Sequence, residues 1–390
     1  MQLSISSRLK KLPPYLFREI DEIKKRMLDE GKRVIDLSIG DPDLPTPPYI
    51  IEALCRAVKD PRTHRYPSYD GLLNFRESIA KWYKKRFDVE LNPKSEVIVL
   101  IGSKEGIAHL PLAFLDPGDE ALVPNPGYPV YTQSTILAMG QPKPFTLSWD
   151  NGFLPDVEEL KNIVSAKTKL LFLNYPNNPT SARASIQFFD RVVEFAKSHN
   201  LVVAHDAAYS EICSSNPSPS FLKAKGSMDV GVEFHSLSKI FNMTGWRVGF
   251  CVGSKDVLNA LMRVKSNVDS GTFEAIQMAG IEALERAGEI STELQGVYKK
   301  RRDRVEGILK KAGFEIFQSD STFYLWCKVP LAMGSKDFAK RLIEEGQVII
   351  TPGVGFGSAG EGYFRITLTA SNQDLEEGSL RIIKVLANQE

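Results

Sequence analysis

Between about residues 50 and 275, short apolar runs alternate with segments that favour helices. Strands are predicted at 97–101, 120–123, 169–173, 201–205, 232–235 and 247–252. Helices are predicted at 104–114, 128–139 and 186–198. The strands lack a clean alternation of apolar and polar residues, so both faces of their sheet are expected to be covered. This pattern is typical of an α/β fold with a mostly parallel, doubly wound sheet.

The flanking segments have a different pattern, and a chain of 390 residues is longer than one core usually supports. Before this region, we expect a helix over 15–30, a strand over 34–39 and a rigid loop from Gly40 to Pro48. After it, we expect helices at 292–311, 335–345 and 375–388 among strands at 315–317, 323–328, 348–351 and 363–368. The sequence therefore predicts a large domain of residues 45–280 and a smaller α+β domain of residues 1–44 and 281–390.

The charge balance argues against nucleic acid as a partner, because 49 Lys and Arg residues face 48 Asp and Glu residues. The four cysteines form no Cys-x-x-Cys pair and the histidines lack ligand spacing, so no metal site is expected. No apolar run approaches the ~20 residues of a membrane span, and the first residues lack the apolar core of a signal peptide. A cytoplasmic protein without membrane contacts is expected.

Five short segments, rich in polar residues, glycine and proline, lie at strand ends of the expected sheet. In such sheets, ligands bind at the carboxyl ends of the strands. Each segment alone also has an ordinary structural explanation, such as a helix cap or a turn. Their coincidence predicts one cofactor cleft. The segments are Gly102–Gly106, Pro124–Pro129, Asn174–Thr180, His205–Tyr209 and Ser236–Arg247.

The last segment carries the most specific chemistry. Lys239 offers an amine that can form a Schiff base with an aldehyde, and Ser236, Ser238 and Arg247 offer donors for a phosphate. Pyridoxal phosphate is the common cofactor that carries both groups. We therefore expect Lys239 to be its covalent anchor, with a pKa depressed by the neighbouring cations.

The other segments supply partners for the rest of that cofactor. The helix start at Ser103 leaves backbone N–H groups for a phosphate, and Tyr128 offers a ring for stacking. Asn178 and Tyr209 can donate to a ring oxygen. Asp206 ends a buried strand and needs a partner, for which a pyridinium N–H is suitable.

The order of these motifs resembles class I and II aminotransferases of fold type I. It runs from Ile39-Gly40-Asp41-Pro42 through Gly102-Ser103-Lys104, Pro-Gly-Tyr128, Asn178-Pro179, Asp206-x-x-Tyr209, Ser236-x-Ser238-Lys239 and Arg247 to Arg365. The resemblance implies a mostly parallel seven-stranded sheet in the large domain. Within this family, the similarity to LL-diaminopimelate aminotransferases rests on Leu16-Phe17, Gly102-Ser103-Lys104-Glu105-Gly106 and Tyr66-Pro-Ser-Tyr69-Asp-Gly71.

The resemblance also implies roles for the matching residues. Lys239, Asp206 and Tyr209 are expected to take part in catalysis. In some relatives a lysine at the position of Lys104 contacts a distal substrate carboxylate instead of the phosphate. Within this subunit, the residues expected to hold the cofactor are Ser103, Lys104, Tyr128, Asn178, Asp206, Tyr209, Ser236, Ser238, Lys239 and Arg247.

Substrate binding and assembly are implied in the same way. The Arg365 guanidinium is expected to bind the substrate α-carboxylate. Tyr66 matches a tyrosine that reaches the phosphate from the partner subunit, with Tyr69 as the second candidate. A homodimer with its active site at the subunit interface is therefore expected. The residues expected to contact the substrate are Tyr15, Gly40, Tyr128, Asn178 and Arg365.

The implied activity is transfer of an amino group between an amino acid and a 2-oxo acid by a ping-pong mechanism. LL-diaminopimelate and 2-oxoglutarate are the expected pair, in lysine biosynthesis. Aspartate, alanine and aromatic aminotransferases share most of the motifs and remain alternatives, as does a β-lyase. One departure from many relatives is Ser181, which stands in place of a glycine and can change the bend of its loop.

Two other classes of protein are disfavoured. A cofactor-binding sensor of a transcription regulator would carry a basic helix-turn-helix segment, for which the residues before the first expected helix leave no room. A dinucleotide-dependent dehydrogenase would carry Gly-x-Gly-x-x-Gly after a strand, and this motif is not found.

Overall fold

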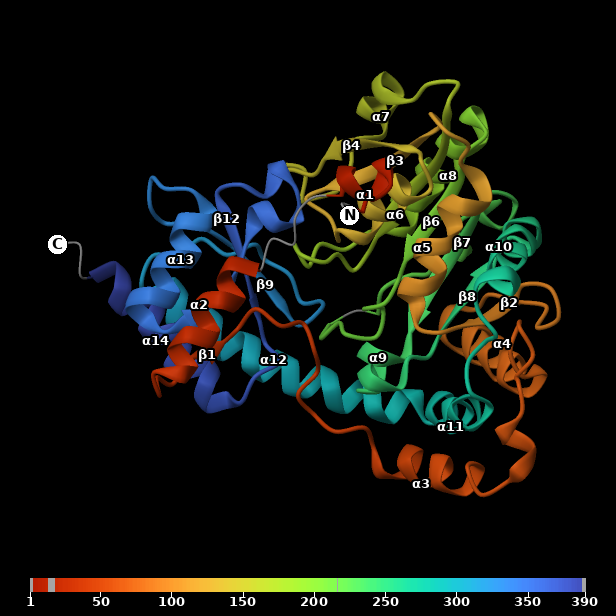
Figure 1. Cartoon of the computed structure of the whole chain (residues 1–390), viewed down its shortest axis with the longest axis horizontal. Helices are drawn as coiled ribbons and strands as arrows, with labels where there is room; N and C mark the ends of the chain where they lie inside the picture. The colour runs from red at the N-terminus through yellow and green to blue at the C-terminus, as the bar shows by residue number, and fades with distance from the viewer. Residues whose placement is uncertain (1–2, 13–17, 216, 388–390) are drawn as a thin grey trace.

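The computed structural model describes residues 3–12, 18–215 and 217–387. Its central sheet has seven strands in the order β2-β8-β7-β6-β5-β3-β4 (Figure 1). These are β2 (Val97–Leu100), β3 (Glu120–Asn125), β4 (Gln141–Thr146), β5 (Thr168–Asn174), β6 (Val202–Asp206), β7 (Gly231–Ser236) and β8 (Gly249–Gly253). The pairs formed among β3 to β7 are parallel, whereas β8 is antiparallel to both of its neighbours. The expected mostly parallel seven-stranded sheet is therefore confirmed.

Two strands of this sheet differ from the sequence prediction. Strand β4 is missed because Pro142 and Pro144 discourage a strand. It lies at the sheet edge, where a missing N–H donor is tolerated. The strand expected at 247–252 begins instead at Gly249, because Arg247 has a left-handed backbone with φ 55°.

Helices cover both faces of the sheet and explain why its strands do not alternate in polarity. On one face lie α5 (Ser103–Phe114), α6 (Val130–Leu137) and α10 (Lys255–Val268), which bury residues such as Leu110 and Leu261 against Phe172. On the other face, α4 (Leu73–Phe87) and α8 (Ile186–His199) contribute to the larger apolar core. The expected helix at 128–139 is shorter than predicted, and Met139 after it has φ 65°.

A second group of elements lies beside this sheet, on the left in Figure 1. Strands β9 (Tyr324–Lys328), β11 (Thr351–Pro352) and β12 (Tyr363–Thr367) form an antiparallel sheet in the order β11-β12-β9. Strands β1 (Ile35–Asp36) and β10 (Val348–Ile349) form a parallel pair. Around them lie α2 (Arg18–Asp29), α13 (Ser335–Gly346) and α14 (Asn372–Ala387). The domain boundaries at residues 44/45 and 280/281 stay a prediction.

Several expected elements here are corrected. The strand at 315–317 reduces to one bridge between Ile316 and Cys327, and the strand at 348–351 is divided into β10 and β11. The strand at 34–39 is only β1. Helix α12 (Ala287–Lys311), which runs along both groups of elements in Figure 1, begins five residues before the expected start. Ala287 and Ile290 are buried there, and this packing outweighs the helix-weakening Gly288.

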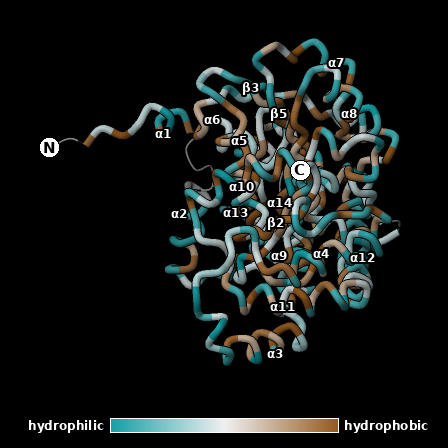
Figure 2. The backbone as a smooth tube through the Cα atoms, turned by 90° about the vertical axis from the view of Figure 1, so that its right-hand side faces the viewer, coloured by the Kyte–Doolittle hydropathy of each residue, from teal (hydrophilic) through white to brown (hydrophobic). Residues whose placement is uncertain are grey.

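The remaining helices are α1 (Ser7–Lys11), α3 (Pro48–Ala57), α7 (Val157–Ile163), α9 (Leu237–Ile240) and α11 (Glu274–Glu285). In Figure 2 the segment that leads into α1 projects from the rest of the molecule. This segment carries the exposed apolar side chains Leu3 and Ile5, and α1 carries the exposed Leu9. None of the helices described is long and apolar enough to cross a membrane.

A buried polar network links β6 and β7 to α4 on one face of the sheet. Glu233 accepts hydrogen bonds from His205 Nδ1 at 2.8 Å, His235 Nε2 at 2.9 Å and the Tyr83 hydroxyl at 2.6 Å. Burial opposes ionisation of Glu233, but the hydrogen bonds from the two histidines lower its pKa. His205 and His235 precede Asp206 and Ser236, so this network lies next to the strand ends that carry the candidate site.

Candidate active site

A cleft of about 270 Å³ lies where the loops after several strands of the central sheet meet. Its lining includes every sequence-predicted site residue except Tyr15 and Tyr66. The predicted residues that line it are Gly40, Ser103, Lys104, Tyr128, Asn178, Asp206, Tyr209, Ser236, Ser238, Lys239, Arg247 and Arg365. Residues that the sequence did not single out also line it, namely Ile107, Asn174, Ala208, Thr244 and Tyr324.

The two exceptions have different causes. Tyr15 lies outside the described residues. Tyr66 is 89% exposed, and Tyr69, Val268 and Phe273 are also exposed. The segments 66–69 and 268–273 that carry these residues are adjacent, because a Cβ on Gly271 would lie 2.9 Å from the Ser68 carbonyl oxygen. Tyr66 does not line the cleft of its own chain, and its contact with the cofactor of a partner subunit stays a prediction.

The strand directions explain why distant segments reach one edge of the sheet. The parallel strands β3, β5, β6 and β7 all end there. Because β8 runs the opposite way, the residue that precedes it, Arg247, also lies at this edge. The register agrees, since Gly249 pairs with Leu100 on one side and with Ser236 on the other.

Lys239 lies on α9, the single helical turn directly after β7. Ser236 starts this turn, and its Oγ accepts a hydrogen bond from the backbone N–H of Ser238. The Lys239 Nζ donates to the Gly40 carbonyl at 2.9 Å. Burial lowers the pKa of Lys239 to about 8, with Arg247 acting in the same direction. An amine with this pKa can take up and release a proton near neutral pH.

Asp206 ends β6 as a buried carboxylate. Burial raises its pKa, while hydrogen bonds from the Tyr131 hydroxyl at 2.9 Å and the Ala208 N–H at 3.2 Å favour ionisation. Tyr131 is missed by the sequence reasoning. Its spacing of three residues from Tyr128 is the only signal, because such a spacing places two side chains on one side of a helix start.

Four residues of the cleft lining carry groups suited to a phosphate. Ser103 begins α5, and Ser236, Ser238 and Arg247 line the same cleft. The Ser238 Oγ is buried and has no hydrogen-bond partner in the described part of the chain. Gly102, with φ 75°, lets the Arg247 guanidinium approach, because a Cβ there would overlap it. Hydroxyls, a guanidinium and a helix start suit a phosphate.

Asn174 and Asn178 connect this edge to the second sheet. The Asn174 Nδ2 donates to the Asp206 carbonyl at 2.8 Å, and its Oδ1 accepts from the Asn178 N–H at 2.7 Å. The Asn178 Oδ1 accepts from Arg365 Nη1 at 2.6 Å. This hydrogen bond from Arg365 fixes the orientation of the Asn178 amide. The NH₂ group of Asn178 is then available to donate a hydrogen bond.

Arg365, in the middle of β12, is a buried cation with donors to spare. Its Nη2 donates to the Ser38 carbonyl at 2.7 Å, and its Nε has no hydrogen-bond partner in the described part of the chain. The guanidinium carbon lies 4.1 Å from the ring centre of Tyr324 and 4.8 Å from that of Phe356. Such a fixed guanidinium is a suitable receptor for a carboxylate.

Gly40 closes the same side of the cleft. A Cβ at this position would overlap the Tyr324 hydroxyl, so the close approach requires glycine. The loop after it is held by Asp43, which accepts two hydrogen bonds from Arg301 at 2.7 and 2.8 Å. A bidentate pair of this kind fixes the loop more firmly than a single contact.

Ser181 has φ 64°, the left-handed conformation that glycine adopts more easily. Its Oγ lies 2.6 Å from Thr322 Oγ1 and donates to the Tyr324 carbonyl at 2.9 Å. These bonds hold the strained residue against the segment that carries Tyr324.

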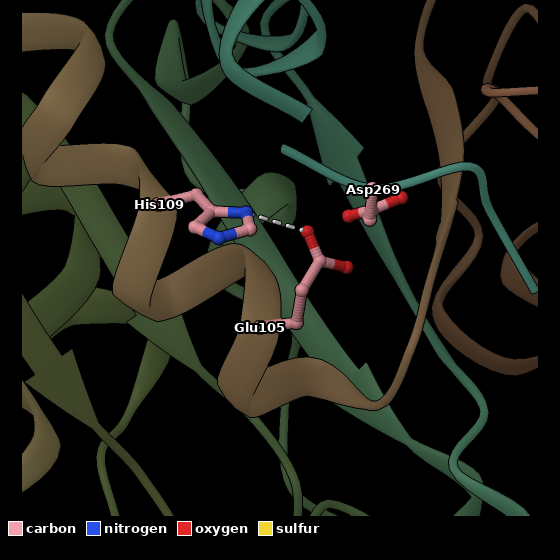
Figure 3. A group of neighbouring side chains, drawn as sticks. All are labelled: Glu105, His109 and Asp269. Atoms are coloured by element: carbon pink, nitrogen blue, oxygen red, sulfur yellow. Dashed lines mark hydrogen bonds and ion pairs between the residues drawn. The ribbon is translucent and has the colours of Figure 1, made fainter. Parts of the chain in front are cut away.

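A separate group of acidic and histidine side chains lies behind the cleft. In Figure 3, His109 Nδ1 faces Glu105, and Asp269 lies beside them. The Lys265 ammonium, which Figure 3 does not draw, lies 3.2 Å from Glu105 and 2.8 Å from Asp269. A cation of the protein itself therefore balances these carboxylates, and we interpret the group as a link between α5 and α10.

A family model described as aminotransferase class I and II matches residues 32–382. The chain belongs to this family. Relatives among the aminotransferases include the LL-diaminopimelate aminotransferase of Aquifex aeolicus, with 51% identity over 97% of this chain and 98% of the relative. The LL-diaminopimelate aminotransferase of Syntrophobacter fumaroxidans is 50% identical over 97% of this chain and 98% of the relative.

Solved structures share the fold, an aminotransferase among them. Substrate-bound BacF from Bacillus subtilis matches with a TM-score of 0.94 and 38% identity, over 98% of each chain. The aromatic aminotransferase from Pyrococcus horikoshii matches with a TM-score of 0.88 and 31% identity, over 94% of this chain and 99% of that one. The fold type I architecture expected from the sequence is confirmed.

Proposed function

We propose that this aminotransferase uses pyridoxal phosphate and transfers the amino group of LL-diaminopimelate to 2-oxoglutarate, a step of lysine biosynthesis. The observation that carries the reaction type is the buried Lys239 amine, placed in one cleft with Asp206 and Arg365. The amino donor is supported by the identity of about half of the residues, over nearly the whole chain, with relatives that carry this name.

The cleft residues fit pyridoxal phosphate. The Ser238 hydroxyl is buried without a hydrogen-bond partner in the described part of the chain, and it suits a phosphate. The Asp206 carboxylate is hydrogen-bonded, but burial raises its pKa, and a pyridinium N–H would stabilise its charged form. We assign Ser103, Ser236, Ser238 and Arg247 to the phosphate, Asn178 and Tyr209 to the ring oxygen, and Tyr128 to the ring face. Bound pyridoxal phosphate supplies an aldehyde that condenses with amines and a ring that accepts electrons from the substrate.

The chain itself positions the substrate and moves the proton. Arg365 binds the α-carboxylate, and Asn178 holds the guanidinium in place through its Oδ1. Lys239 Nζ then removes the proton from the substrate Cα and returns it in the next step. Its pKa of about 8 provides both the free amine and the ammonium near neutral pH.

We propose a homodimer for the same enzyme. Tyr66, Tyr69, Val268 and Phe273, from two adjacent segments, are exposed in the single chain, and so are the apolar side chains of the projecting N-terminal segment. Exposed apolar patches of this kind mark protein contacts. In the dimer, Tyr66 would complete the phosphate subsite of the partner subunit. Two measurements on wild type and Tyr66→Phe test this. In sedimentation we expect the variant to stay dimeric, and in an absorption titration we expect it to bind the cofactor more weakly.

A half-reaction screen tests the choice of substrate. The purified enzyme is mixed with single amino acids, and the loss of the absorption of the Lys239-linked cofactor is followed. We expect LL-diaminopimelate and glutamate to remove it, and 2-oxoglutarate to restore it. If LL-diaminopimelate has no effect while aspartate, alanine or an aromatic amino acid does, the proposed donor is wrong.

The same screen distinguishes amino transfer from elimination. A β-lyase on this fold would release ammonia and retain the original absorption, whereas transfer releases no ammonia and requires a 2-oxo acid. Lys239→Ala is the control for the mechanism. We expect its turnover to fall by at least about 10³-fold, because both the covalent link and the proton carrier are removed. Turnover at the wild-type rate would overturn the mechanism.

A further inference from the structure

We propose that Tyr324 is a positioning residue that connects the substrate carboxylate subsite to the cofactor's ring oxygen. This inference rests on the proposed function and deepens it. Tyr324 lies on β9, in the second sheet, yet it lines the cleft. It contacts Arg365 with its ring face and Tyr209 with its hydroxyl, at 4.1 and 3.0 Å.

The surroundings of Tyr324 leave it one position. Its ring is 2% exposed, the Gly40 backbone lies against its hydroxyl, and its carbonyl accepts from Ser181. The ring of Phe323 packs edge-on at 4.9 Å. Both functional ends of the side chain are thus fixed, the hydroxyl at Tyr209 and the ring face at Arg365.

The hydrogen count gives the direction of the tyrosine pair. Tyr209 has one hydroxyl hydrogen, and its proposed role is to donate it to the cofactor's ring oxygen. Its oxygen must then accept from Tyr324, so Tyr324 donates to Tyr209. Successive hydrogen bonds polarise one another in a buried site. The Tyr324 hydroxyl should therefore make Tyr209 a stronger donor.

Arg365 reaches the ring oxygen by two routes that differ in kind. The first runs through Asn178, which accepts from Arg365 and can donate to the oxygen. The second runs through Tyr324, whose ring holds the guanidinium by a cation–π contact and whose hydroxyl acts on Tyr209. Removing the hydroxyl alone, or the ring as well, separates the two contributions of Tyr324.

The first test is a pH titration of the absorption of the cofactor-loaded enzyme. The titration reports the pKa of the nitrogen that joins Lys239 to the cofactor, next to the ring oxygen. Donors to the ring oxygen stabilise its negative charge, so losing a donor makes that oxygen hold the proton of this nitrogen more strongly. We expect Tyr324→Phe to raise the pKa of the nitrogen by about 0.5 pH unit, and Tyr209→Phe to raise it by about 1 unit or more. In the double variant, the effect of Tyr324→Phe should disappear, because Tyr209 is the group through which it acts.

The second test concerns the carboxylate subsite and uses propionate, which has a carboxylate but no amino group. Tyr324→Phe keeps the ring over Arg365, so propionate should bind as it does to wild type. Tyr324→Leu removes the ring, and we expect binding weaker by about threefold to tenfold. Equal weakening in both variants would contradict the assignment of the ring to Arg365.

Tyr298→Phe is the matched control. Tyr298 is also a buried tyrosine that packs on Phe323, but its hydroxyl has no hydrogen-bond partner in the described part of the chain. It should change neither the titration nor propionate binding. If Tyr209→Phe shifts the titration and Tyr324→Phe does not, or if the two shifts add in the double variant, the inference fails while the proposed function stands. An enzyme without cofactor absorption would overturn the proposed function itself.

Discussion

The two halves of the cleft are built in different ways. The half proposed to hold the cofactor, called the cofactor half, consists of short segments that each follow a strand of the central sheet and carry Ser103, Asp206 and Lys239. The half proposed to bind the substrate, called the substrate half, brings together Gly40, Tyr324 and Arg365, which come from opposite ends of the chain and lie on or against the smaller sheets. The first half depends on local geometry at strand ends, and the second on how distant segments pack.

This difference predicts that the halves can be altered separately. Cofactor affinity should follow changes at the edge of the central sheet, whereas substrate affinity should follow changes around Arg365. Lys239 of the cofactor half contacts the other half, since its Nζ donates to the Gly40 carbonyl. Lys104, which lies over the Tyr128 ring, is assigned to neither half. The following expectations, from the largest to the smallest effect, test this division.

Replacing Lys239 by Met should stabilise the cofactor-free protein at pH 7. Folding lowers the pKa of Lys239 from 10.5 to about 8, which costs about 3 kcal/mol. The cost is present in full below pH 8 and is gone above pH 10.5, because the unfolded chain holds the extra proton only between these values. Urea unfolding at pH 7 and pH 11 measures it. A stability difference that does not shrink at the higher pH would contradict this reasoning.

Replacing Arg365 by Leu should lower kcat/KM for the amino donor by about 100-fold, because a charged hydrogen-bonding partner of the carboxylate is lost. Arg365→Lys keeps the positive charge but not the paired N–H donors of the guanidinium, so it should recover only part of the loss. The cofactor dissociation constant, measured by absorption, should change far less than kcat/KM in either variant, because Arg365 reaches the cofactor only through Asn178 and Tyr324. A parallel loss of cofactor would show that the halves are not independent.

Lys104→Met tests which half this residue serves. Its Nζ lies 5.9 Å from the ring centre of Tyr128, the ring proposed to stack on the cofactor. We therefore expect the distal carboxylate of the substrate to be its partner, and KM for LL-diaminopimelate to rise by about tenfold. Weaker cofactor binding with an unchanged KM would assign Lys104 to the phosphate instead.

Ser181 gives the smallest effect. Ser181→Ala keeps the left-handed backbone but loses the bonds to Thr322 and Tyr324, so we expect a loss of about 1 kcal/mol of stability. Ser181→Gly loses the same bonds but relieves about 1 kcal/mol of strain and should stay close to wild type. Thermal unfolding compares the two variants. A glycine variant less stable than the alanine variant would refute the balance of bonds and strain.

The sequence predicts the cofactor half better than the substrate half for a physical reason. Asp206 and Lys239 are polar residues at the ends of apolar strands, a pattern that is visible locally. Tyr324 lies within an apolar strand and Tyr131 within a helix, and neither differs from a core tyrosine until the fold brings Asp206, Tyr209 and Arg365 to them.

The same distinction applies to the fold. The central strands are predicted because they are short and apolar, whereas β4 is missed because its prolines are acceptable only at an edge, which depends on the order of the strands. Arg365 is identified only through the family resemblance, since a lone arginine in a strand carries no signal of its own. The proposed role of Tyr66 depends on a second subunit, which one sequence does not show.

The buried Glu233 network has a consequence for handling the enzyme in acid. Its hydrogen bonds hold the pKa of Glu233 below the ordinary 4.5, so their contribution to stability is present in full above about pH 4.5 and is lost as the pH falls toward the lowered value. Strands β6 and β7 should therefore keep their anchorage in mildly acidic buffer. Cofactor lost near pH 5 would then be released from an intact sheet, and returning the enzyme to neutral buffer with fresh cofactor should restore it without refolding.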